Sequence, residues 1–160
     1  MKPSQGVLMK GNRISFIAGW GAIDSNAHMA NTAYLDFAAD SRFTYFKENG
    51  FPGSEFSRRG IGPVVRKDEI EYFREYRLLE KGTVELKLAG ISEDGSRFRL
   101  ANLFYTEDGI LAAVIKSTGG WLDLRSRTLT CPPAELLELL RALSKTDDYE
   151  PLPSSVKVAC

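Results

Sequence analysis

The stretch from Asn31 to Glu48 decides the fold and reads NTAYLDFAADSRFTYFKE. It contains no glycine or proline, its first residue is of a type favoured at a helix N-cap, and Asn49-Gly50 after it supplies a stop signal. On a helix, its polar residues fall on one narrow stripe, and apolar and aromatic residues cover most of the remaining circumference. That stripe consists of Asp36, Asp40, Thr44 and Lys47. The stretch therefore predicts a long helix that the rest of the protein encloses on most sides.

Strands are predicted on both sides of this helix. Residues 13–20 are rich in β-branched and aromatic side chains, which is typical of a strand. After the helix, a connection containing glycine and proline leads to a meander, whose last two strands each follow an Asp-Gly turn. The strands of the meander are expected at residues 64–77, 83–91, 97–106 and 110–124. An enclosed helix between one strand and such a meander predicts an α+β fold, in which a curved antiparallel sheet wraps around the helix.

The length and composition describe one globular domain. The chain has 160 residues, of which 43% are hydrophobic and 26% charged, enough to bury a core without metals or disulfides. A last helix over 134–145 opens after two prolines and carries leucines along one face. The polar remainder contains Pro151 and Pro153 and predicts a loose tail. We therefore expect a single domain over residues 1–145 and a C-terminal tail over residues 146–160.

Charge and residue inventory exclude several classes of function. Lys and Arg number 21 and so do Asp and Glu, whereas nucleic-acid and membrane-surface binders need an excess of cations. A single histidine, His28, excludes a His-rich metal site, and no nucleotide-binding glycine motif occurs. Cys131 and Cys160 are too few for a disulfide framework or a metal cluster. With no apolar run of membrane-spanning length, we expect a cytoplasmic protein without metal, nucleic acid or membrane partners.

The loop before the predicted helix carries a spaced set of polar residues. His28 follows Asp24 by four positions, Asn31 follows it by seven and Tyr34 by ten. This spacing resembles the active-site signature of the 4-hydroxybenzoyl-CoA thioesterase-like hotdog family, in which an Asp precedes Gly-His, Asn and a Tyr that leads the central helix. The chain departs from that signature at Ala27, where the family has glycine. It also has alanine at position 22, where the family often has an acidic residue.

The resemblance covers roughly residues 10 to 130, because the order of strand, helix and meander is also similar to the hotdog fold. It implies an acyl-CoA thioesterase that cleaves a thioester with water to a carboxylic acid and free CoA. It also implies a homodimer or homotetramer with sites at subunit interfaces, because a single sheet of this kind leaves edges unprotected. No cofactor is implied. The substrate would be a small-molecule thioester of CoA or of an acyl-carrier protein.

Thioester hydrolysis needs a group that activates water or attacks the carbonyl, and a donor that stabilises the oxyanion. Asp24 is the candidate for general base or nucleophile. The N-terminus of the helix offers amide groups without intrahelical partners, and the N–H of Asn31 is the candidate oxyanion donor. His28 is expected to support catalysis by organising the loop.

Other residues would bind the substrate. Tyr34 is expected in the pocket wall, and Trp20 is a further aromatic candidate for lining the acyl pocket. Arg125 and Arg127, after the last strand of the meander, are the first candidates for the CoA phosphates. Two other basic pairs stay open as alternatives: Arg58-Arg59 and Arg66-Lys67.

Each of these assignments has a purely structural alternative. Asp24 can be a turn or cap residue, and Asn31 can be an N-cap without a chemical role. Asp36 and Asp40 are alternative carboxylates on the helix, although their polar stripe favours solvent. Arg42 lies off that stripe, which suggests a buried or interfacial ion pair. At the level of function, the alternatives are a non-catalytic binding module for acyl-CoA or acyl-carrier protein and a 3-hydroxyacyl thioester dehydratase.

Overall fold

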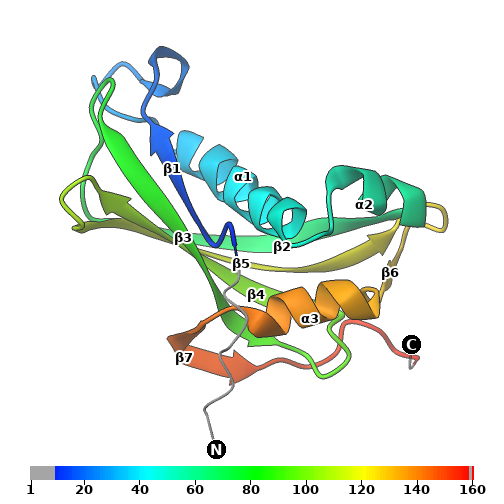
Figure 1. The fold of residues 1–160 in the computed structure, drawn as a ribbon. Helices are drawn as coiled ribbons and strands as arrows, with labels where there is room; N and C mark the ends of the chain where they lie inside the picture. Colours follow the sequence, from blue (N-terminus) through cyan, green and yellow to red (C-terminus); the bar gives the residue numbers. More distant parts are fainter. Residues whose placement is uncertain (1–9, 159) are drawn as a thin grey trace, which may run out of the picture.

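The structure is a computed structural model that describes residues 10–158 and residue 160. One curved sheet wraps around the long helix α1, Ala33–Glu48 (Figure 1). The strands of the main path lie in the order β1-β3-β4-β5-β2, and every neighbouring pair is antiparallel. They comprise β1 (Arg13–Ile17), β2 (Ile61–Tyr72), β3 (Lys81–Ile91), β4 (Arg97–Thr106) and β5 (Leu111–Asp123). The predicted α+β arrangement is confirmed.

Several smaller elements accompany the main path of the sheet and α1. The 3-10 turn η1, Trp20–Ala22, leads from β1 toward α1, and the short helix α2, Gly53–Arg59, follows α1. Strand β6, Thr128–Thr130, pairs with β5, and α3, Ala134–Ala142, precedes β7, Lys145–Pro151. None of the described helices combines the length and apolar character needed to cross a membrane.

The core lies between α1 and the concave face of the sheet. Ala33, Tyr34 and Ala38 of the first half of α1 pack with Phe16 and other residues of β1, β3, β4 and β5 in one cluster. The second half of the helix packs with α2, α3 and the buried Trp121 in another cluster. The predicted enclosure of the helix is therefore confirmed in part: two distinct sets of elements cover Tyr34, Ala38, Tyr45 and Phe46, whereas Phe43 is 44% exposed.

The entry into α1 differs from the prediction. The helix begins at Ala33, and its N-cap is Thr32, which has helical backbone angles and makes no side-chain cap bond. The N–H of Ala33 already bonds the carbonyl of Ala30 at 3.0 Å, so a closed turn runs into the helix. An N-cap side chain normally acts from an extended residue, and this turn provides none at Asn31. The predicted N-cap role of Asn31 is wrong.

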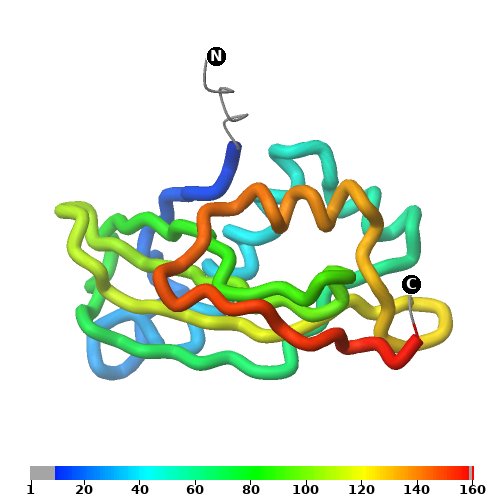
Figure 2. Tube along the Cα trace, turned by 90° about the horizontal axis from the view of Figure 1, so that it is seen from below, coloured from blue at the N-terminus to red at the C-terminus, as the bar shows by residue number. Residues whose placement is uncertain are grey.

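Other elements also differ from the prediction. The connection after α1 contains helix α2, β2 stops at Tyr72 instead of residue 77, and α3 stops at Ala142. The expectation of a loose tail is wrong as well, because β7 pairs with β3 in parallel through Leu88 and Lys145 (Figure 2). A strand stays ordered in a polar sequence when a neighbouring strand supplies its backbone hydrogen bonds.

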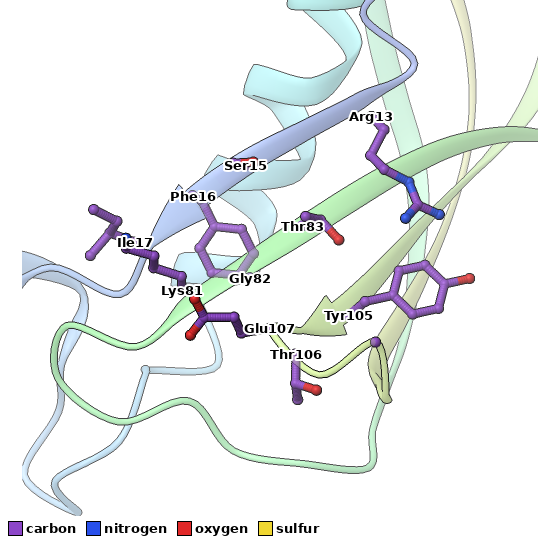
Figure 3. Close-up of a pocket in the computed structure, with 11 residues that line it drawn as sticks. Arg13, Ser15, Phe16, Ile17, Lys81, Gly82, Thr83, Tyr105, Thr106 and Glu107 are labelled. Atoms are coloured by element: carbon purple, nitrogen blue, oxygen red, sulfur yellow. The ribbon is translucent and has the colours of Figure 1, made fainter.

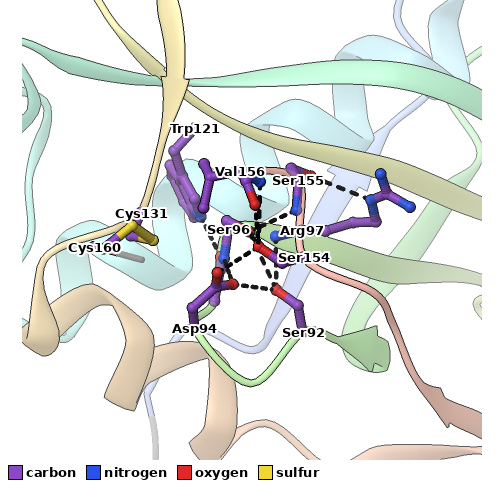
Figure 4. Close-up of a disulfide and its surroundings, with 11 residues drawn as sticks. Ser92, Asp94, Ser96, Arg97, Trp121, Cys131, Ser154, Ser155, Val156 and Cys160 are labelled. Atoms are coloured by element: carbon purple, nitrogen blue, oxygen red, sulfur yellow. Dashed lines mark hydrogen bonds between the residues drawn. A yellow bond between two sulfur atoms is a disulfide. The ribbon is translucent and has the colours of Figure 1, made fainter. Parts of the chain in front are cut away.

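The two cysteines form one disulfide bond, Cys131–Cys160, with the Cα atoms 6.0 Å apart. This bond ties the last residue of the chain to the segment that leads into α3 (Figure 4). The cysteine count therefore gives no support to a location in the cell interior, because disulfides are typical of oxidising compartments.

Asp94, in the turn between β3 and β4, holds the C-terminal segment (Figure 4). Its carboxylate accepts hydrogen bonds from Ser92 Oγ at 2.8 Å, from the N–H of Ser96 at 2.9 Å and from Ser154 Oγ. Burial alone would raise the pKa of the Asp94 carboxyl, but the hydrogen bonds from these three serines outweigh burial and hold the pKa well below its usual range.

We predict that Asp94→Asn lowers the free energy of unfolding by about 1–2 kcal/mol at neutral pH, because charged hydrogen bonds are lost. Since the folded pKa is depressed, this contribution is complete above the unfolded Asp pKa of about 3.9 and is lost as the pH falls toward the folded pKa. Urea unfolding at several pH values measures the difference. Asp108→Asn, in the other Asp-Gly turn, is the control. Equal effects of the two substitutions would contradict the prediction.

Candidate active site

The loop between η1 and α1 fixes Asp24 by a small closed turn. The N–H of Asp24 bonds the carbonyl of His28 at 3.0 Å, and the N–H of Ala27 bonds the carbonyl of Asp24 at 3.1 Å. The Asp24 carboxylate accepts a further bond from the N–H of Asn26 at 2.8 Å. Ala27 completes the turn with φ of 63°, a left-handed conformation that favours glycine. Alanine therefore occupies a position here whose backbone conformation favours glycine.

Asp24 and His28 lie close together. His28 Nε2 is 4.0 Å from Asp24 Oδ1, and their side chains are 33% and 30% exposed. Both side chains are therefore accessible from solvent, and a protonated His28 would form an ion pair with the carboxylate. The structure brings these two predicted residues together.

The N-terminus of α1 carries free amide donors. In residues 10–158 the N–H groups of Asn31 and Thr32 have no hydrogen-bond partner, whereas that of Ala33 is bonded. The Asn31 carbonyl is held by the side chain of Tyr72 on β2, whose Oη donates a hydrogen bond of 3.1 Å. Free N–H groups at a helix start carry partial positive charge and can receive a developing negative charge. The geometry therefore suits the oxyanion role that the sequence suggests for Asn31.

A cavity of about 560 Å³ opens beside these groups. Its lining includes His28, Asn31, Tyr34 and Tyr72. Tyr34 is 2% exposed, its ring centroid is 5.1 Å from that of Tyr72, and burial, assisted by Tyr72 and Glu75, raises its pKa to about 12. The Tyr34 hydroxyl therefore stays protonated and offers a neutral donor.

The role of Tyr72 was not predicted from the sequence, although strand alternation places Tyr72 and Ile70 on one face of β2. Trp20, expected to line the acyl pocket, is 82% exposed and does not line this cavity. On α1, Asp36 and Asp40 are exposed. Arg42 donates to Ser117, which in turn donates to Asp68. Burial lowers the pKa of Arg42 and Asp68 opposes this shift. The two residues are connected only through the Ser117 hydroxyl and Asp68 is exposed, so Arg42 has no buried ion pair among the described residues.

Arg125 and Arg127 lie far from Asp24 within one chain. They occupy the exposed turn between β5 and β6, where Ile61 at the start of β2 pairs with Asp123. Tyr72 is at the other end of β2, and a rise of about 3.3 Å per residue puts the two ends roughly 35 Å apart. The structure does not bring these two arginines to the cavity beside Asp24.

A different set of cations converges on the outer face of the sheet. Phe98 and Leu100 of β4 point into the core, so the alternating Arg97 and Arg99 point away from α1. With Arg66 and Lys67 of β2 they line a cavity of about 340 Å³, which we call the cationic groove. Arg97 Nε donates to Ser155 Oγ at 3.2 Å, and Arg99 Nη1 to Glu150 Oε1 at 2.9 Å. The pair Arg66-Lys67 was an open alternative from the sequence, whereas Arg97 and Arg99 were missed.

The largest described cavity, of about 710 Å³, lies elsewhere (Figure 3). It runs over the ends of β1, β3 and β4, where the Arg13 guanidinium pairs with Glu85 and lies 5.2 Å from the centre of the Tyr105 ring. None of the residues predicted from the sequence to act in catalysis or substrate binding lines it. We therefore place the candidate chemistry at the smaller cavity beside His28 and Asn31.

Comparisons with known proteins agree with this architecture. Residues 18–142 match the model of the thioesterase-like superfamily. No curated protein sequence matches the chain. Among solved structures, SAV2348 of Staphylococcus aureus, determined in complex with CoA, is 18% identical with a TM-score of 0.74, covering 93% of this chain and 94% of its own.

Two further structures share the fold. The 1,4-dihydroxy-2-naphthoyl-CoA thioesterase Slr0204 of Synechocystis is 11% identical, with a TM-score of 0.72 over 81% of this chain and 94% of its own. The gentisyl-coenzyme A thioesterase BH1999 is 15% identical, with a TM-score of 0.70 over 78% of this chain and 98% of its own. At these sequence identities the structural similarity shows the fold, and the match to the family model shows the family. The chain belongs to the thioesterase-like superfamily and has its hotdog fold.

Proposed function

We propose that the protein is an acyl-CoA thioesterase that uses Asp24 and the N-terminus of α1. The observation that carries the proposal is that His28, within 4.0 Å of the Asp24 carboxylate, and Asn31, whose N–H has no described partner, both line a cavity of about 560 Å³. A carboxylate next to free helix N-terminal amides supplies both groups that thioester hydrolysis needs. The family and the thioesterases of the same fold support this reaction class.

The chemistry follows from those positions. As general base, Asp24 removes a proton from water while the water oxygen attacks the thioester carbonyl carbon. The carbonyl oxygen becomes negative, and the N–H of Asn31 stabilises it. Collapse of this intermediate breaks the carbon–sulfur bond, and the leaving CoA thiolate takes up the proton. As nucleophile, Asp24 would attack the carbonyl itself and expel the CoA thiolate, and water would then hydrolyse the acyl–aspartyl anhydride to the carboxylic acid and free Asp24. His28 positions the Asp24 carboxylate in either route.

We assign the CoA phosphates to the cationic groove. Guanidinium groups bind phosphates through paired hydrogen bonds, and Arg97 and Arg99 stand side by side there with Arg66 and Lys67. Arg66 lies about 20 Å along β2 from Tyr72, a span that an extended pantetheine arm can bridge. A neutral total charge is compatible with this site, because four cations in one groove suffice for a polyanionic substrate.

We further propose a homodimer formed through β2. This strand ends the main path of the sheet, and among the described strands none pairs with its outer edge. Antiparallel pairing of two β2 edges across a two-fold axis would continue the sheet and protect both edges. The axis would exchange the strand ends, so Arg125 and Arg127 of the partner subunit would approach the cavity beside Asp24. That arrangement keeps a substrate-binding role open for both arginines.

Loss of the Asp24 carboxylate tests the reaction. We predict that Asp24→Asn lowers kcat by roughly 10²- to 10⁴-fold, the usual worth of a general base. Release of free thiol from short, long, branched and aryl CoA esters measures the rate. Asp36→Asn, on the exposed stripe of α1, is the matched control and should keep its turnover. Undiminished thiol release by Asp24→Asn would refute the proposal, and CoA binding without any release by the unaltered protein would favour a non-catalytic binding module.

The left-handed turn at Ala27 gives a second test. We predict that Ala27→Gly raises the free energy of unfolding by roughly 0.5–1 kcal/mol, because glycine adopts this backbone conformation without steric cost. Denaturant unfolding measures the change. Ala39→Gly within α1 is the control and should destabilise by a similar amount, since glycine is unfavourable inside a helix. A destabilised Ala27→Gly variant would show that the turn depends on the alanine methyl group.

The phosphate assignment has its own test. We predict that Arg97→Gln raises KM for acyl-CoA about tenfold and leaves kcat nearly unchanged, because one charged hydrogen bond to a phosphate is worth about 1.5 kcal/mol. Arg77→Gln, an exposed arginine paired with Glu75, is the control. A larger KM effect from Arg125→Gln or Arg127→Gln than from Arg97→Gln would move the phosphates to the dimer arrangement and overturn the groove assignment.

A further inference from the structure

The C-terminal segment, residues 145–158 and 160 as described, lies outside the residues that match the family model. We propose that this segment tunes phosphate binding in the cationic groove, with Glu150 as the residue that lowers the affinity. The Glu150 carboxylate forms an ion pair with the Arg99 guanidinium and competes with a ligand phosphate for this group. The inference rests on the proposed binding of CoA phosphates in this groove, and its test separates the two.

The segment is fixed to the sheet beside the groove by several independent contacts (Figure 4). Strand β7 pairs with β3, where Glu150 lies opposite Gly90. Farther on, Ser154 bonds Asp94, the N–H of Ser155 bonds Ser96 Oγ at 2.8 Å, and the disulfide holds the last residue. A Cβ on Gly90 would lie 2.7 Å from the carbonyl oxygen of Glu150, so the backbones are in close contact. Glu150 is therefore presented at a defined place.

The segment contacts two of the three arginines that line the groove. Ser155 lines the groove and accepts a hydrogen bond from Arg97 Nε at 3.2 Å. Glu150 Oε1 accepts from Arg99 Nη1 at 2.9 Å, while Arg99 Nε is held by Thr118 Oγ1 at 3.2 Å. Two of the nitrogens through which Arg99 would bind a phosphate in paired fashion are therefore already used within the chain.

A carboxylate at this place opposes phosphate binding in two ways. A phosphate can reach Arg99 only by displacing or sharing the carboxylate, and the two anions repel each other. The Glu150 side chain is 60% exposed and that of Arg99 28%, so water screens the pair and it is easily exchanged. We therefore expect Glu150 to reduce the affinity for phosphates without blocking the groove.

The neighbouring acidic residues allow a matched comparison. Asp147, Asp148 and Glu150 all belong to β7. Asp148 pairs with Lys116 of β5, whereas Asp147 is exposed and has no described ion pair in residues 10–158. Removing the charge of Asp147 therefore changes the net charge by the same amount as removing that of Glu150, without freeing an arginine.

Calorimetric titration of the full chain with adenosine 3′,5′-bisphosphate and with CoA tests the inference. Glu150→Gln should lower Kd roughly two- to fivefold, the range expected for an exposed pair, and should steepen its dependence on salt. Asp147→Asn should change Kd by less. In an Arg99→Gln background, the gain from Glu150→Gln should disappear, which a general effect on folding would not produce.

The outcomes distinguish the role of Glu150 from the binding of CoA phosphates in the cationic groove. If the unaltered chain binds both ligands but Glu150→Gln and Asp147→Asn behave alike, or if Glu150→Gln weakens binding, the role of Glu150 is overturned and the groove assignment stands. If the unaltered chain hydrolyses acyl-CoA while Arg97→Gln and Arg99→Gln bind both ligands as tightly as it does, the groove assignment fails together with this inference. Thermal unfolding of each variant verifies that the fold is intact.

Discussion

The enclosure of α1 is the constraint on which the rest of the structure depends. A helix with apolar and aromatic residues over most of its circumference is stable only when other elements cover those residues, and here the curved sheet, α2 and α3 do so. Glycines at crowded positions of the sheet permit that curvature, because they carry no side chain. A Cβ on Gly82 would lie 2.6 Å from the Phe16 ring, and one on Gly119 would lie 2.1 Å from the carbonyl oxygen of Val64. Register shifts in β2 and β3 bend the same sheet.

The candidate site follows from where this helix has to begin. Its first turn emerges at the end of the sheet near Tyr72, and Tyr72 fixes the Asn31 carbonyl. The preceding loop is closed on itself by the backbone bonds of Asp24, so the carboxylate and the free amides come from one short segment. A site of this kind needs few contacts with the rest of the sheet. This explains why four residues spaced along one segment suffice to indicate it.

The periodicity of each segment and the spacing of its residues along the chain decide which features the sequence could predict. The central helix and the meander show strong periodicity and clear Asp-Gly turns, so their types were predictable and mainly their ends differ. The loop motif was visible because its residues are near one another in the chain. Helix α2 was missed because its short sequence, GSEFSRR, lies between glycine and proline signals. Strand β7, KTDDYEP, has no alternation, and its order comes from β3 and from distant partners such as Arg99.

The cationic and anionic residues of the chain are equal in number, but a count of residues does not reveal where they lie in the fold. Arg97 and Arg99 alternate with buried residues along β4, so the strand itself directs both cations to one outer face. The carboxylates of β7 approach that face through the Arg99–Glu150 and Lys116–Asp148 pairs, whose members are 51 and 32 residues apart in the sequence. Two cations, Arg99 and Lys116, are thus paired with carboxylates of a segment that meets them only after folding. A phosphate ligand would exchange with an anion that the chain already supplies, which makes a neutral protein compatible with a polyanionic substrate.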